Sequence, residues 1–221
     1  MAARRSLAFV TALAASSSLL LSACGGGGET PSTSGKPSKS GKAGAPDQTS
    51  PAKSSGVPSG RGGAPRISLP PDVALDIAKP DADARSRAAL ADLSYAIAAL
   101  IDGKAKGDGG TASMRHAFDS EAGRYWAEAI EDFRKSGRTI TGSYRYYGLE
   151  TDLVDRDSAD ARYCEDQRVA YPKDRKTGKV FRTEPSNDDF FLYTLKLRKV
   201  DGVWKVAQVQ WAKGDASCVR R

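Results

Sequence analysis

The chain has 221 residues, of which 39% are hydrophobic, and a formal net charge of +7 at pH 7. Most of this charge lies in the first 68 residues, because residues 1–23 contain two arginines and no acid, and residues 24–68 contain six basic and two acidic side chains. Residues 69–221 are therefore left near neutrality, whereas a nucleic-acid-binding domain needs a basic face. Because the basic residues lie outside the expected domain, we do not expect nucleic acid to be a partner of this protein.

Residues 1–23 have the pattern of an export signal. Arg4 and Arg5 precede an apolar and small-residue run that ends at Leu21-Ser22-Ala23-Cys24. The run is too short, and too rich in alanine and serine, for a good membrane-spanning helix. The closing tetrapeptide resembles the lipobox of bacterial lipoproteins, which implies cleavage before Cys24 and a diacylglycerol on its sulfur. An ordinary signal peptide with a chance cysteine is the alternative, and the two arginines leave the export route open between general secretory and twin-arginine.

Residues 24–68 form a Gly-, Ser-, Pro- and Lys-rich segment with almost no large apolar side chain. Such a segment cannot bury enough surface to offset its ordering entropy, so we expect a disordered tether. A coil of this length spans roughly 35 Å. Its basic residues suit anionic lipid headgroups or cell-wall polymer. The expected location is the extracytoplasmic face of the bacterial plasma membrane, with the membrane itself as a partner through the lipid on Cys24.

Residues 69–221 form the expected folded domain, which begins with helices. Residues 67–80 are punctuated by proline and expected to be extended. A helix is predicted from Asp81 or Asp83 to Gly103, because leucine and isoleucine recur at helical spacing. A second helical region is predicted from Met114 to Gly137, and its longer part has one broad apolar face and a cap at Asp119 or Ser120.

After residue 137 the apolar period changes from helical to alternating, which indicates strands. We predict strands over residues 139–153, 158–171, 190–200 and 203–211, with a long loop over residues 172–188. Asp201-Gly202 is the signature of a two-residue hairpin turn. This order of elements, with helices followed by an antiparallel meander of four strands, is typical of the α+β class.

The closing segment Asp201-Gly202-Val203-Trp204-Lys205-Val206, together with the helix–sheet order, resembles NTF2-like or SnoaL-like domains. The resemblance covers nearly all of residues 81–211. It implies an α+β cone of the cystatin-like kind, with N-terminal helices packed on a curved antiparallel sheet of about four strands and a pocket between the two. The whole chain is also similar to tethered actinobacterial lipoproteins of this fold.

The domain contains two cysteines, Cys164 and Cys218. An even number of cysteines outside the cytoplasm indicates a disulfide. This bridge would attach the C-terminus to the middle of the chain. Two buried free thiols are the alternative.

Candidate ligand-contacting residues are aromatic, because the domain has few groups suited to catalysis. His116 lies at the start of the second helical region without a partner fixed by spacing, so a surface or capping role is favoured over a general base. The acidic residues Asp152, Asp155, Asp157 and Asp160 lack the ligand rhythm and glycine of a calcium loop, so a solvated turn is favoured. No catalytic residue, metal site or cofactor is predicted. The aromatic side chains expected to line a pocket, with a purely structural core as the alternative, are Tyr125, Trp126, Tyr144, Tyr146, Tyr193 and Trp211.

Three functions fit these features. The first, favoured because groups for catalysis are sparse, is a non-enzymatic accessory or binding lipoprotein that presents its domain to a wall component, an apolar small ligand or an envelope protein. The second is a cone-fold isomerase, dehydratase or cyclase acting on an apolar small molecule. The third is a protein-interaction module that uses the sheet or the basic run of residues 173–179.

Overall fold

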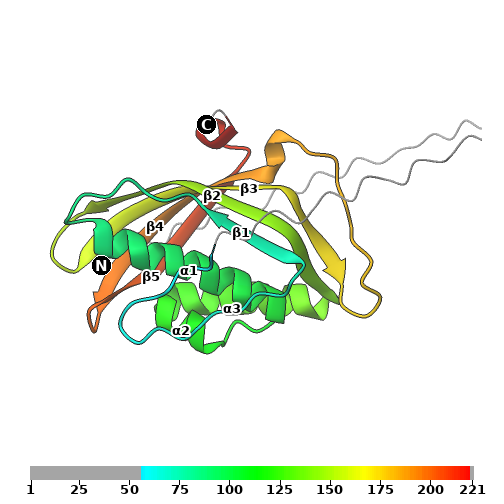
Figure 1. Ribbon diagram of the computed structural model, residues 1–221, viewed down its shortest axis with the longest axis horizontal. Helices are drawn as coiled ribbons and strands as arrows, with labels where there is room; N and C mark the ends of the chain where they lie inside the picture. Colours follow the sequence, from blue (N-terminus) through cyan, green and yellow to red (C-terminus); the bar gives the residue numbers. More distant parts are fainter. Residues whose placement is uncertain (1–55, 220–221) are drawn as a thin grey trace, which may run out of the picture. The chain divides into compact units, whose positions relative to one another are not determined.

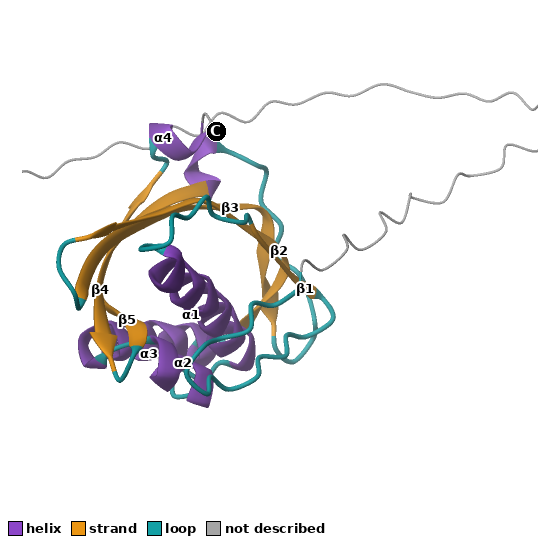
Figure 2. Cartoon of the chain, turned by 60° about the vertical axis from the view of Figure 1, so that its left-hand side comes forward, coloured by secondary structure: helices purple, strands orange, loops and turns teal. Residues whose placement is uncertain are grey.

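The structure, a computed structural model, describes residues 56–219. The expected signal peptide, the lipobox with Cys24 and most of the expected tether lie outside these residues. Within them, a curved five-stranded sheet wraps around helices (Figures 1 and 2). The helices are α1 (Arg87–Lys106), α2 (Ala112–Ala117), α3 (Ser120–Lys135) and α4 (Ala216–Val219). The strands are β1 (Val73–Ile77), β2 (Arg138–Leu153), β3 (Ser158–Asp174), β4 (Phe190–Val200) and β5 (Val203–Lys213).

The sheet has the order β1-β2-β3-β4-β5, in which β1 is parallel to β2 and every other pair is antiparallel. The expected α+β class and the helices on a curved sheet are confirmed. The predicted number of four strands is wrong, because the extended segment of residues 67–80 contains β1. Prolines flank this five-residue strand, and the sheet edge tolerates them because an edge strand donates fewer ladder hydrogen bonds.

Helix α1 lies inside the curve of the sheet, as Figure 2 shows. Its residues from Ala89 to Gly103 are buried except for Ala91. A helix enclosed on all sides needs apolar residues around its whole circumference rather than on one stripe. The helix continues past the predicted end at Gly103 and stops at Gly107, whose φ of 70° is left-handed and whose N–H donates to Gly103 O.

Two irregularities bend the long β2–β3 pair. The register shifts between Ser143 and Arg145, and again between Tyr147 and Glu150. Gly142 is required beside the first shift, because its φ is 93° and a Cβ there would lie 2.1 Å from Val169 O. The bends let the sheet curve far enough to enclose α1 (Figure 2).

The β4–β5 hairpin has the predicted turn. Asp201 and Gly202 have φ values of 50° and 80°, and Val200 pairs directly with Val203. The long loop is shorter than predicted, because β3 extends to Asp174.

Residues 56–68, which the sequence assigns to the tether, pack on the domain. Ile67 is buried, Val57 and Ala64 pack against the core, and the Tyr95 hydroxyl donates to Pro65 O at 2.8 Å. The folded part of the chain therefore begins before residue 69. Among residues 56–219, no helix is long and apolar enough to cross a membrane.

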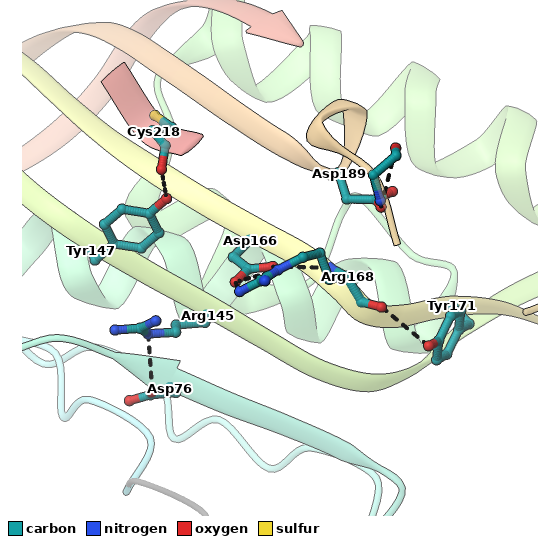
Figure 3. A network of polar contacts seen from close by, with 9 residues as sticks. Asp76, Arg145, Tyr147, Asp166, Arg168, Tyr171, Asp189 and Cys218 are labelled. Atoms are coloured by element: carbon teal, nitrogen blue, oxygen red, sulfur yellow. Dashed lines mark hydrogen bonds and ion pairs between the residues drawn. The ribbon is translucent and has the colours of Figure 1, made fainter. Parts of the chain in front are cut away.

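The convex side of the sheet carries a second, smaller core under α4. The predicted disulfide is present, with the Cys164 and Cys218 sulfur atoms 2.01 Å apart. These cysteines pack with Tyr147 and Phe190, and the Tyr147 hydroxyl donates to Cys218 O (Figure 3). The disulfide thus fixes the C-terminal helix to the outer face of the sheet.

Candidate functional site

A cavity of about 250 Å³ opens between the end of α1, helix α3 and strands β2 and β3. Most of its lining is apolar, which is the usual composition of a small-molecule site. The lining residues are Lys104, Trp126, Ala129, Ile130, Phe133, Ile140, Tyr144, Gln167, Ala170, Tyr171 and Pro172.

The periodicity of the flanking elements explains why these residues meet. On α3, Trp126, Ile130 and Phe133 recur at the three- and four-residue spacing of one helix face. On β2, Ile140 and Tyr144 lie an even number of residues apart and therefore face the same side. The apolar helix face and the concave strand face are the two walls of the cavity.

Three polar groups border the cavity without a partner among residues 56–219. The Lys104 ammonium lies 5.1 Å from the centre of the Trp126 ring, and no carboxylate is within ion-pair distance of it in this part of the chain. Neither the Tyr144 hydroxyl nor the Gln167 amide makes a hydrogen bond to any described residue. Tyr144 as a whole is only 4% exposed. Burial, and to a smaller extent the charge of Glu165, raises the pKa of Tyr144, which therefore stays a neutral donor.

A cluster of tyrosines surrounds one buried carboxylate on β3. Glu165 is 1% exposed, and its Oε1 accepts a hydrogen bond of 2.6 Å from the Tyr146 hydroxyl. The Tyr163 and Tyr193 rings stack at 4.8 Å. Burial, with the Glu165 charge as the next cause, raises the pKa of Tyr146, Tyr163 and Tyr193 well above the ordinary tyrosine value. Glu165 and Tyr146 do not line the cavity.

Sequence reasoning missed Glu165. Its place could have been found by strand alternation, since it lies two residues after the inward Tyr163. A carboxylate at an inward position is informative because it needs hydrogen-bond donors around it.

The six candidate aromatic residues have three different environments. Trp126 and Tyr144 line the cavity. Tyr146 and Tyr193 belong to the buried cluster around Glu165. Tyr125 and Trp211 are 42% and 49% exposed and contact each other, with the Trp211 indole N–H donating to the Tyr125 hydroxyl at 2.9 Å.

His116 lies away from the cavity. Its ring meets the Tyr95 ring edge-on at a centroid distance of 5.4 Å, and its buried Nε2 has no hydrogen-bond partner within the described chain. The nearby Asp92 accepts the Trp204 backbone N–H at 3.0 Å, and burial raises the pKa of its carboxyl group. These groups do not line the cavity between α3 and β3.

The acidic residues form a turn and surface ion pairs. Asp155 accepts the Asp157 backbone N–H and the Ser158 hydroxyl, and Asp160 pairs with Lys196 at 2.7 Å. Among residues 56–219 no three His, Cys, Asp or Glu side chains converge as metal ligands.

On the convex side, Figure 3 shows a network of polar contacts that includes Arg145, Asp166 and Arg168. Arg168 forms a two-pronged contact with Asp166, which lowers the pKa of that carboxyl group against the opposing effect of burial. Arg145 lies 3.8 Å from Asp76 and over the Tyr147 ring. Arg145 thus joins β1 to β2, whereas Arg168 and Asp166 pair with each other within β3.

No protein-family model matches the chain, and no curated protein matches it. Solved structures do match, at low similarity. A ketosteroid isomerase-like protein from Erwinia carotovora atroseptica is 17% identical over 56% of this chain and 95% of that one, with a TM-score of 0.39. The hexachlorocyclohexane dehydrochlorinase LinA-type3 from Novosphingobium barchaimii is 12% identical over 60% of this chain and 90% of that chain, with a TM-score of 0.43. An NTF-2 like protein of unknown function from Shewanella oneidensis is 14% identical over 54% of this chain and 95% of that chain, with a TM-score of 0.35. These values are too low to transfer the role of any residue.

Proposed function

We propose that this protein is a lipid-anchored, extracytoplasmic binding lipoprotein whose domain takes a small, mainly apolar molecule into the cavity between α3 and β3. The observation that carries the proposal is the cavity itself, with apolar walls and three unpartnered polar groups. The hydrogen-bonding capacity of these groups is not used within the described chain, so a ligand that enters the cavity can pair with them.

The position of the acid–base groups favours binding over catalysis. The buried Glu165 and its hydrogen-bond partner Tyr146, on the concave face, are not part of the cavity lining. A general base must come within hydrogen-bond reach of the proton that it removes. The residues that do line the cavity include no carboxylate and no histidine.

The anchor and location come from the opening of the sequence. Leu21-Ser22-Ala23-Cys24 predicts a diacylglycerol on Cys24, and two acyl chains hold a protein on a membrane stably. The Gly- and Ser-rich segment then gives the domain reach from the membrane surface. We therefore place the cavity in the cell envelope, where it meets ligands outside the cytoplasm.

The test is a fluorescence titration of the full chain with N-phenyl-1-naphthylamine, a neutral dye that brightens in apolar surroundings. We expect saturable binding to one site. Ala170→Phe should weaken it at least about tenfold, because a ring on this wall occupies the cavity. Val169→Phe is the matched control, since Val169 is the adjacent residue, is 55% exposed and does not line the cavity.

Ala129→Phe, on the opposite wall, is a second blocking variant in case the first disturbs the β2–β3 pair. Far-UV circular dichroism establishes that each variant is folded. Equal binding by wild type and by both folded blocking variants would contradict the proposal, as would the absence of saturable binding.

A further inference from the structure

Resting on the proposed function, we infer that the ligand is an apolar monocarboxylic acid whose carboxylate pairs with Lys104. The inference follows from the charge of the cavity lining. Lys104 is the one charged residue among the eleven that line the cavity. A ligand with a single negative charge would complement it.

Lys104 differs from Lys106 and Arg134 in having no acidic partner among residues 56–219. Lys106 pairs with Asp102 at 2.7 Å, and Arg134 pairs with Glu131 at 2.7 Å. Lys104, which is half-buried, instead holds its ammonium over the face of Trp126. A cation–aromatic contact orients the ammonium group, but the ring does not act as a conventional hydrogen-bond acceptor. The N–H groups of the ammonium therefore stay available to donate to a carboxylate.

The neutral polar groups at the wall complete the recognition. The Tyr144 hydroxyl stays protonated, and the Gln167 side-chain amide both donates and accepts. These groups suit a hydroxyl or carbonyl substituent on the apolar body of the ligand. Glu165 pairs in register with Tyr146, two residues along β2 from Tyr144, and its charge acts on the Tyr144 hydroxyl, so the negative charge of the ligand is disfavoured at that end. The carboxylate therefore points to Lys104 and the apolar body to Ile130 and Ile140.

One cation also limits the charge of the ligand. A phosphate monoester or a dicarboxylate would bring a second negative charge into an apolar cavity without a second partner, which is costly. A neutral ligand would leave the half-buried Lys104 ammonium facing apolar surface. A monocarboxylate avoids both costs.

The experiment compares 2-naphthoate with 2-naphthamide by isothermal titration calorimetry on the full chain at pH 7. The two probes share the ring system and the number of heavy atoms and differ in charge. We expect the wild type to bind 2-naphthoate at least about tenfold more tightly, as a charge-assisted pair is stronger than a neutral hydrogen bond. Lys104→Met should abolish this preference, and Lys104→Arg should retain it.

Lys199→Met is the matched control, because Lys199 lies 5.7 Å from the Trp204 ring and does not line the cavity. This variant should keep the wild-type preference. Equal affinity of the wild type for both probes would overturn the role of Lys104 while leaving the apolar binding site in place. Binding of neither probe would overturn this inference, and the dye titration would then decide separately whether the cavity binds any apolar molecule. A preference for 2-naphthoate that survives in Lys104→Met would also overturn it.

Discussion

The buried tyrosines make the stability of this domain sensitive to alkaline pH. Tyr95, Tyr144, Tyr146, Tyr163 and Tyr193 all have a raised pKa in the folded state, with burial as the largest cause. Unfolded tyrosine titrates near pH 10. The stabilisation from keeping these phenols neutral is therefore complete below about pH 10 and is lost as the pH rises towards their folded pKa values.

The size of the effect follows from the number of groups. Above about pH 10 the unfolded chain releases five protons that the folded chain retains. Each such proton lowers the free energy of unfolding by about 1.4 kcal/mol per pH unit, so five lower it by about 7 kcal/mol per unit. A domain of ordinary stability, about 5–15 kcal/mol, should then unfold within about one to two pH units above pH 10.

The assay is phenolate absorbance at 295 nm recorded beside circular dichroism. Of the eight tyrosines in the chain, no more than three should ionise before unfolding, and the rest should ionise with it. Tyr163→Phe should reduce the pH dependence by about a fifth. Tyr171→Phe is the control, since that hydroxyl is exposed and donates only to Arg168 O. Ionisation of all eight tyrosines near pH 10 in a folded domain would refute the reasoning.

Two further predictions concern the cysteines. Replacing Cys164 and Cys218 together by alanine should lower the free energy of unfolding by up to about 4 kcal/mol in urea titrations, since the bridge closes a loop with a sequence separation of 54, and a loss below about 1 kcal/mol would contradict this role. In the native host, an alkyne analogue of palmitate should label the wild type and not Cys24→Ser, and equal labelling of both would refute lipidation at Cys24.

Much of the architecture could be predicted, because local patterns specify it. The apolar spacing of Leu90, Leu93 and Ile97 gives α1, and Asp201-Gly202 gives the last hairpin. Strand β1 was missed as an element because its five residues, flanked by prolines, carry too short a pattern. The packing of residues 56–68 was missed because it depends on tertiary contacts such as that of Tyr95 with Pro65, which composition does not encode.

The candidate site was predicted only in part. An aromatic residue on an apolar face can belong equally to a core or to a cavity wall, so Trp126 and Tyr146 were indistinguishable in sequence although only Trp126 lines the cavity. The sequence did not single out Lys104 as a binding residue, because a lysine is common in the last turn of a helix. Its significance arises from the missing acidic partner, which requires the neighbouring elements to be placed.

The most direct test of the central claim is to locate a bound probe by nuclear Overhauser effects in the full chain. With 2-naphthoate present, the account predicts contacts from the naphthalene protons to the methyl groups of Ile130 and Ala170, on opposite walls of the cavity. Saturable binding without contacts to either methyl group would place the ligand elsewhere and contradict the account.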